Sequence, residues 1–174
     1  MRPVAQPLPE RDLARVAECA REDLLTLRGE SLFITGGTGF IGSWLLESLC
    51  HASRSLDLRL RIRVLTRDAV GFAARLPHLY AEPSVGIVQG DVRNLVSEGA
   101  EHDVVIHAAT DASAQLNVEN PLLMADTIIE GTRRTLEFSR AARARRVLIL
   151  SSGGVYCKFM PGVTHAREDY PGGP

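Results

Sequence analysis

The sequence is 174 residues long, which suits one domain with a buried core, and its formal net charge of −1 suggests neither nucleic acid nor a membrane surface as a partner. Cys19, Cys50 and Cys157 are widely spaced and odd in number, which argues against a disulfide framework or a zinc site. No apolar run approaches membrane-spanning length and the N-terminus has no apolar signal core, so we expect a cytoplasmic protein without a metal site.

The N-terminal segment precedes the first predicted strand. Residues 1–9 carry three prolines and are expected to be irregular. From Arg11 to Leu27 the apolar residues recur at helical spacing, which predicts an amphipathic helix. We expect its apolar stripe to pack on the domain that follows or on a missing partner. The chain is therefore divided into a lead-in with a helix at 1–30 and a domain at 31–174.

Residues 32–49 read LFITGGTGFIGSWLLESL, an apolar run followed by a glycine-rich turn and a helical apolar pattern. This order is typical of a dinucleotide site, because the backbone must turn tightly and let a pyrophosphate approach its amides without a Cβ in the way. A helix beginning near Gly39 would direct its free N–H groups and its positive dipole end at the phosphates. The alternative is a glycine-rich turn with a purely structural role.

Further strands are predicted at 58–66, 85–89, 103–107 and 147–150, where short apolar runs meet small or polar residues. The last of these is apolar at every position, as expected of a strand covered by helices on both faces. The fold class is therefore α/β, a Rossmann-type doubly wound parallel sheet of about five strands in the order 3-2-1-4-5.

The segments between the strands are predicted to be helical or polar. We expect a polar connection at 51–57, a short helix at 69–79 broken around Pro77, and a polar loop at 111–120. A longer helix should follow to about Arg143, because Asn120 is a favourable N-cap and Pro121 a favourable first residue.

Five short motifs occur in order along this pattern, namely TGGTGFIG at 35–42, GDV at 90–92, HAA at 107–109, GT at 131–132 and SSGGVY at 151–156. Together they resemble the landmarks of the NAD-dependent epimerase/dehydratase family, extended short-chain dehydrogenases that act on nucleotide-sugars. The resemblance covers about Ser31 to Pro174. It implies a parent enzyme that oxidises a nucleotide-sugar hydroxyl by hydride transfer to NAD(P) and then epimerises, dehydrates or reduces the product.

The resemblance also implies a set of site residues. The cofactor-binding set is Gly36, Gly37, Thr38, Gly39, Phe40, Ile41, Gly42, Arg67, Asp91, Val92, Ala108, Ala109 and Ser151. Asp91 would lie beside the adenine, or serve only as a turn residue at a strand end. Ser152 falls on the family's catalytic Ser/Thr, whose hydroxyl bonds the sugar oxygen undergoing oxidation, or it merely ends a strand. His107 is expected to be a strand-end histidine satisfied by the backbone and not a base.

The choice between NAD and NADP depends on the residues that end the second strand, Thr66-Arg67-Asp68. Arg67 could pair with a 2′-phosphate, since a guanidinium fits phosphate in a bidentate fork, and this slightly favours NADP. Asp68 could instead accept hydrogen bonds from the ribose of NAD, or cap the next helix.

Departures from the family pattern concern the catalytic residues. Ile128 stands where the family commonly has asparagine, and Cys157 where it usually has glycine. The family's base is a tyrosine with a lysine four residues later, but Tyr80, Tyr156 and Tyr170 are followed at that spacing by Ser84, Met160 and Pro174. We therefore expect the N-terminal cofactor-binding portion of a longer enzyme, truncated before the substrate lobe and inactive alone. A non-catalytic dinucleotide-sensing module is the alternative, and the open edge of the fifth strand should be covered by residues 156–174 or by another copy.

Overall fold

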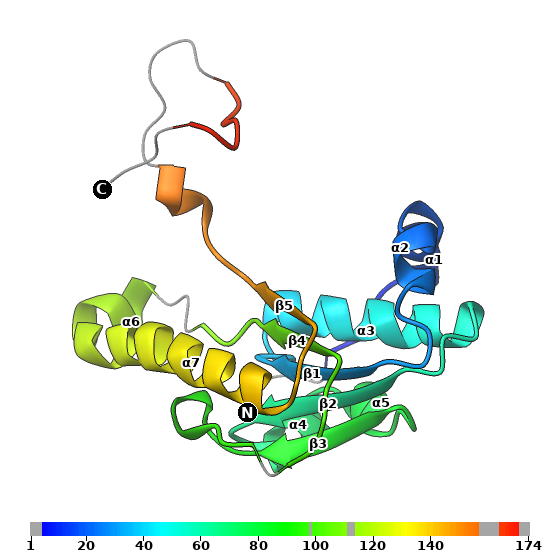
Figure 1. Cartoon of the computed structure of the whole chain (residues 1–174), viewed down its shortest axis with the longest axis horizontal. Helices are drawn as coiled ribbons and strands as arrows, with labels where there is room; N and C mark the ends of the chain where they lie inside the picture. Colours follow the sequence, from blue (N-terminus) through cyan, green and yellow to red (C-terminus); the bar gives the residue numbers. More distant parts are fainter. Residues whose placement is uncertain (1–4, 98, 111–113, 157–163, 171–174) are drawn as a thin grey trace.

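Five parallel strands form one sheet in the order β3-β2-β1-β4-β5 (Figure 1), in a computed structural model that describes residues 5–97, 99–110, 114–156 and 164–170. The strands are β1 (Ser31–Thr35), β2 (Arg61–Thr66), β3 (Val85–Gln89), β4 (Val104–His107) and β5 (Arg146–Ile149). The α/β class and the strand order predicted from the sequence are both confirmed.

Helices connect the strands and cover the sheet. They are α1 (Glu10–Cys19), α2 (Arg21–Leu25), α3 (Phe40–Ser55), α4 (Ala69–Arg75), α5 (Pro77–Tyr80), α6 (Ala114–Glu119) and α7 (Pro121–Ala141), with single 3-10 turns η1 (Val92–Asn94) and η2 (Gly153–Tyr156). The break at Pro77 and the start of α7 are as predicted, and the Asn120 side chain accepts a hydrogen bond from the Leu123 amide at 3.2 Å.

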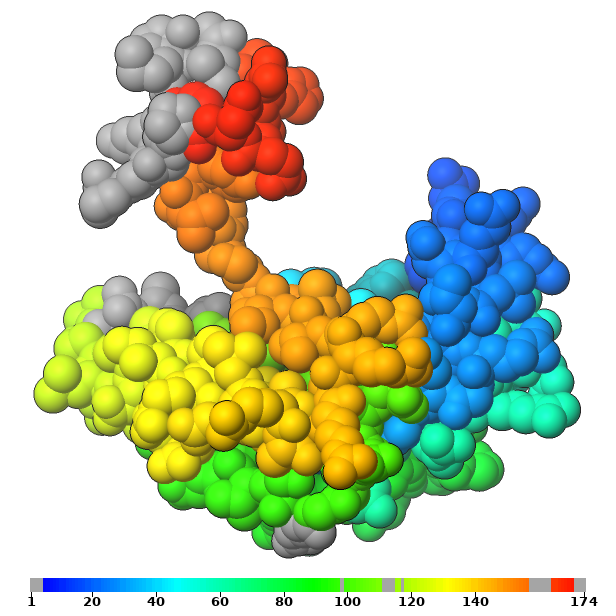
Figure 2. Space-filling model, viewed as in Figure 1, coloured from blue at the N-terminus to red at the C-terminus, as the bar shows by residue number. Residues whose placement is uncertain are grey.

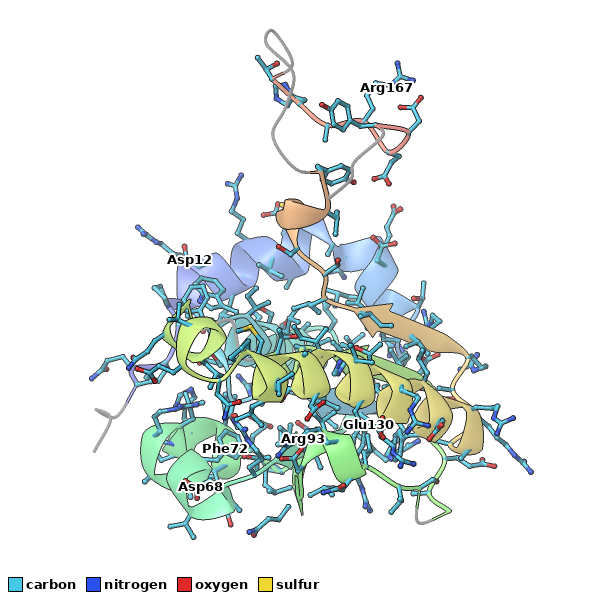
Figure 3. All side chains as sticks on the ribbon, turned by 90° about the vertical axis from the view of Figure 1, so that its left-hand side faces the viewer. Asp12, Asp68, Phe72, Arg93, Glu130 and Arg167 are labelled. Atoms are coloured by element: carbon cyan, nitrogen blue, oxygen red, sulfur yellow. The ribbon has the colours of Figure 1, made fainter. Side chains whose placement is uncertain are left out.

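The alternation of β1 divides the core between the two faces of the sheet. Leu32 and Ile34 belong to a cluster that includes Leu46 of α3 and Phe72 of α4, which is buried beneath its helix (Figure 3). Phe33 points to the opposite face, where its ring centroid lies 4.3 Å from that of Phe138 in α7. The central strand is therefore covered on both sides, as an apolar parallel strand requires.

The N-terminal segment packs on the domain. Leu13 and Ala17 of α1 are buried, and α1 contacts α3. The predicted single helix is interrupted at Ala20, where the backbone leaves helical geometry (φ −105°, ψ 18°) between α1 and α2. Of the two alternatives given for the apolar stripe, the structure shows packing on the domain.

Three local predictions are wrong. Residues 51–55 continue α3, and His51 and Ala52 are buried there. The second strand starts at Arg61 because Asp57 and Arg59 adopt positive φ angles of 50° and 56°, which form a turn. The segment predicted as a polar loop contains α6, in which the Gln115 side chain donates to Glu119 at 2.8 Å.

β5 is the fourth difference, because helices do not cover it on both faces. It is one of the two edge strands of the sheet, and Val147, Leu148 and Ile149 are 41%, 51% and 39% exposed. Figure 2 shows this segment, in light orange, at the surface of the molecule. None of the described residues after β5 pairs with its outer edge, and residues 157–163 and 171–174 of the proposed covering tail lie outside the described part of the chain.

Candidate cofactor-binding site

The glycine-rich turn joins the end of β1 to the start of α3, and its backbone has no room for side chains at two positions. Gly36 has a φ of +72°, and a Cβ there would lie 2.4 Å from the backbone carbonyl of Ala108. A Cβ on Gly42 would lie 2.0 Å from the Gly36 carbonyl oxygen. Gly39 is the N-cap of α3, and its amide donates to the Gly36 oxygen at 2.9 Å. The turn is therefore packed against the end of β4 and against the first turn of its own helix.

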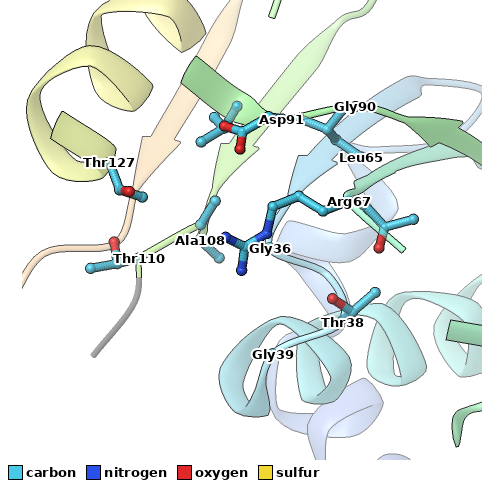
Figure 4. A pocket seen from close by; sticks show the side chains of 13 residues that line it. Gly36, Thr38, Gly39, Leu65, Arg67, Gly90, Asp91, Ala108, Thr110 and Thr127 are labelled. Carbon is cyan, nitrogen blue, oxygen red and sulfur yellow. The ribbon is translucent and has the colours of Figure 1, made fainter. Parts of the chain in front are cut away.

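A cavity of about 140 Å³ opens in front of this turn, at the carboxyl ends of β1, β2, β3 and β4 (Figure 4). It is lined by Gly36, Thr38, Gly39, Leu65, Thr66, Arg67, Gly90, Asp91, Val92, Ala108, Ala109, Thr110 and Thr127. The carboxyl ends of parallel strands are where ligands gather in open α/β sheets. The residues present are compatible with a dinucleotide, because Gly36, Thr38 and Gly39 line the cavity and so place the N-terminus of α3 at its wall.

Two charged residues occupy the rim of this cavity from different strands. Figure 4 shows the Arg67 side chain, at the end of β2, extending across the cavity towards Ala108. The Asp91 carboxylate follows β3 and accepts from Arg93 through the backbone amide at 2.9 Å, Nε at 3.0 Å and Nη2 at 2.7 Å. These hydrogen bonds from Arg93 lower the pKa of Asp91 to about 2, so the carboxylate is ionised at neutral pH.

Asp68 does not line the cavity. Its carboxylate accepts a hydrogen bond from the Gly71 amide at 2.8 Å and caps the N-terminus of α4. Of the two roles considered for Asp68, the structure shows helix capping.

His107, at the end of β4, is 2% exposed and bonded by hydroxyl groups. Its Nδ1 lies 2.7 Å from Thr35 Oγ1 and 3.3 Å from Thr135 Oγ1, and its Nε2 lies 3.3 Å from Thr132 Oγ1. Burial lowers its pKa, which favours the neutral ring. The expectation of a structural histidine is upheld, but threonine side chains and not the backbone satisfy it.

The sequence model of the NAD-dependent epimerase/dehydratase family matches residues 32–174. The chain belongs to this family. It is 31% identical over 145 residues to the UDP-glucose 4-epimerase of Mycolicibacterium smegmatis, a match that covers 81% of this chain and 44% of that protein.

Solved structures of family members share the fold. A dTDP-glucose 4,6-dehydratase from Streptomyces venezuelae with NAD and TYD bound matches with a TM-score of 0.70 at 28% identity, covering 83% of this chain and 45% of that one. The UDP-glucose 4-epimerase of Thermus thermophilus in complex with NAD matches with a TM-score of 0.62 at 29% identity, over 83% and 44% of the two chains. The chain thus spans less than half the length of these relatives.

Most of the residues that the family resemblance implied are brought together, and some are not. The cavity is lined by Gly36, Thr38, Gly39, Arg67, Asp91, Val92, Ala108 and Ala109. Gly37 and Gly42 instead pack inside the turn, and Phe40 and Ile41 begin α3 with side chains 81% and 55% exposed. Their backbone amides remain at the helix N-terminus, where a phosphate would meet them.

Ser151 and Ser152 follow β5 and do not line the cavity. Both are exposed, and Ser152 Oγ accepts a hydrogen bond from the Gly154 amide at 3.1 Å at the start of η2. The catalytic role that the resemblance implies for Ser152 therefore stays a prediction. The departure at Cys157 lies outside the described residues.

Five lining residues were missed by sequence reasoning: Leu65, Thr66, Gly90, Thr110 and Thr127. The first four lie within two residues of predicted site positions at strand ends, so the strand-end rule could have found them. Thr127 comes from α7, and no motif marks it. In the part of the chain that the structure describes, no group of three or more His, Cys, Asp or Glu is placed to hold a metal ion. None of the described helices is long and apolar enough to cross a membrane.

Proposed function

We propose that this chain is the NAD(P)-binding portion of a cytoplasmic nucleotide-sugar epimerase/dehydratase. The observation that carries the proposal is the cavity at the carboxyl ends of β1–β4, lined by the glycine turn from which α3 begins. Membership of the family and the NAD bound in two structural relatives support the dinucleotide as ligand. The cofactor would supply the acceptor for a hydride from a sugar carbon.

The residues of this chain would bind and orient that cofactor. Backbone amides at the start of α3 would hold the pyrophosphate, as helix N-termini do, and Arg67 would lie near the adenosine ribose at the end of β2. Ala108 and Ala109 would let the backbone pass close to the nicotinamide half. Ser152 would assist at the sugar hydroxyl, which requires the segment after β5 to turn towards the cavity.

Binding of the dinucleotide is tested directly by titrating the chain with NAD⁺, NADH and NADP⁺ in a calorimeter. Trp44 in α3 is the sole tryptophan, so energy transfer from its fluorescence to bound NADH gives a second readout. We expect saturable binding. A chain that is folded by circular dichroism and yet shows no heat and no energy transfer would contradict the proposal.

A second candidate is a dinucleotide-sensing module without catalysis. The observation that favours it is the position of Ser152 outside the cavity. The two candidates are separated by incubating the chain with NAD⁺ and UDP- or dTDP-sugars while following cofactor absorbance and product identity. We expect no turnover from this chain alone. Turnover that Ser152→Ala abolishes would show that another base exists in these residues.

A further inference from the structure

Arg75, the last residue of α4, reaches the glycine turn from outside the cavity. Its Nη2 donates a hydrogen bond to the backbone carbonyl of Thr38, a residue whose other side lines the cavity. The Arg75 side chain is half-buried. A hydrogen bond from a charged donor to a carbonyl is stronger than one between neutral groups. Here it connects the loop that contains Gly36, Gly37 and Gly39 to α4, a helix that carries none of the predicted phosphate contacts.

The N-terminal segment holds Arg75 through its backbone. The Ala5 amide donates to the Arg75 carbonyl at 2.9 Å. Three residues later, the Leu8 amide donates at 2.8 Å to Oε2 of Glu47, a buried carboxylate in α3. Residues 5–8 therefore connect α4, which carries Arg75, to α3, which begins at the glycine turn.

The same Glu47 carboxylate faces a histidine from α5. Oε1 of Glu47 lies 3.0 Å from His78 Nε2, although the two are not aligned for a hydrogen bond. The segment continues into α1, which packs along α3. Each helix next to the glycine turn is thus fixed to residues that precede the region matched by the family, which starts at residue 32.

We propose that Arg75 is a positioning residue that holds the glycine turn in its binding conformation, and that residues 5–8 hold Arg75. The proposal rests on dinucleotide binding at the cavity. Glycine loses more conformational freedom on ordering than any other residue, so a glycine-rich turn that is left free must be ordered by its ligand. A turn that is already fixed binds more tightly, because that ordering cost is met before the ligand arrives.

The test uses the whole chain with Arg75→Ala, Arg75→Lys and, as a matched control, Arg54→Ala. Arg54 lies in the last turn of α3, at the opposite end of this helix from the glycine turn, and pairs with Glu82. We expect the Kd for NAD⁺ and NADH to rise about tenfold in Arg75→Ala, about threefold or less in Arg75→Lys, and not at all in the control. Hydrogen exchange of the amides at 36–42 without cofactor should accelerate in Arg75→Ala, while core strands keep their protection.

The link to the N-terminal segment is tested with Ala5→Pro, which removes the amide that donates to Arg75. Combined with Arg75→Ala it should cause no further rise in Kd, since residues 5–8 would act on the turn only through the Arg75–Thr38 contact, which Arg75→Ala has already removed. An unchanged Kd in folded Arg75→Ala overturns the role of Arg75, and full additivity overturns the role of residues 5–8. If Arg75→Ala does not fold, Arg75→Lys and Ala5→Pro carry the test. If the unaltered chain binds no dinucleotide, the proposed function fails, whereas the exchange experiment still decides whether Arg75 holds the turn.

Discussion

At the scale of single residues, the glycines of one motif meet different surroundings. A Cβ on Gly36 or Gly42 would overlap backbone atoms at 2.4 and 2.0 Å, which the fold cannot relieve by moving a side chain. A Cβ on Gly39 would meet only the Gly36 oxygen at 3.3 Å, and Gly39 has an extended backbone (φ −78°, ψ −179°) that any residue adopts. A substitution at Gly39 can therefore test cofactor binding without disturbing the fold.

Gly39→Val should abolish NAD(P) binding while the chain stays folded, because the branched side chain stands where the pyrophosphate approaches. Calorimetry measures the binding, and urea denaturation measures the free energy of unfolding. Gly42→Ala is the comparison, and it should lower the free energy of unfolding because of the backbone overlap. Unchanged affinity in Gly39→Val would place the cofactor elsewhere.

Arg67→Ala should reduce affinity for NADP⁺ more than for NAD⁺, by about 1–3 kcal/mol, since only NADP⁺ carries the 2′-phosphate that a guanidinium would pair with. Competition titrations with the two cofactors measure the difference. Equal losses for both, or none, would show that Arg67 does not read the 2′-phosphate although it lines the cavity.

Arg93→Ala should raise the pKa of Asp91 from about 2 towards its ordinary value of 3.8, because the hydrogen bonds from Arg93 are the largest cause of the lowered value. A folded pKa below the unfolded one means that the ionised carboxylate stabilises the fold above about pH 4, and that this contribution is lost as pH falls towards 2. The variant should be less stable than the parent at pH 7, with the difference shrinking over that range. Carbon NMR titration of Asp91 and urea denaturation at several pH values measure both effects.

Residue types were easier to predict than their partners. The glycine turn and the strand-end positions could be predicted, because local backbone geometry selects those residues. The threonines around His107 and the carbonyl bonded by Arg75 come from positions 25 to 72 residues away in the sequence, and no local pattern records such pairings.

At the scale of elements, α4 depends on its cap. Asp68→Ala should lower the free energy of unfolding by about 1 kcal/mol, since the Gly71 amide loses its acceptor. Asp68→Asn should retain most of this stability, because the amide oxygen of asparagine can still cap the helix. Both variants should bind NAD⁺ as the parent does, because Asp68 is not a lining residue. A selective loss of NAD⁺ affinity in both would restore the ribose-binding role.

Elements whose ends are marked by capping or turn residues were predicted with the correct limits at those ends. Elements without such residues were not. β3 has the predicted limits, and α7 starts after the predicted Asn120 cap. α6 was missed because Ala-Gln-Leu-Asn-Val-Glu has no apolar stripe, and isolated propensity is a weak signal over so short a segment. The last turn of α3 was missed because His51 is buried through tertiary packing and lies 3.4 Å from Glu10, on a different helix.

At the scale of the whole molecule, the strand order followed from the βαβ pattern, since right-handed crossovers leave few topologies for parallel strands. Coverage of β5 did not follow from its composition. An apolar run predicts that a strand is buried, but it does not identify the helix, strand or partner that buries it. Here Val147–Ile149 are exposed.

The exposed edge of β5 leads to the last prediction, that this chain self-associates. Its outer N–H and C=O groups meet no strand among the described residues, and natural proteins usually cover or charge such edges. Apolar side chains on both sides of the strand add surface whose burial favours association. The mass measured by sedimentation velocity should therefore rise with protein concentration.

Leu148→Lys should reduce this association, because a charge on the edge strand opposes pairing with a second copy. Val96→Lys places the same charge on another exposed apolar residue, away from β5, and it should leave the association unchanged. Residues 156–174 could cover the edge instead, and a strictly monomeric parent whose β5 amides are protected from hydrogen exchange would identify them as the cover. A monomer with unprotected β5 amides would show that the edge stays bare, and that neither the tail nor a second copy is needed to keep it in solution.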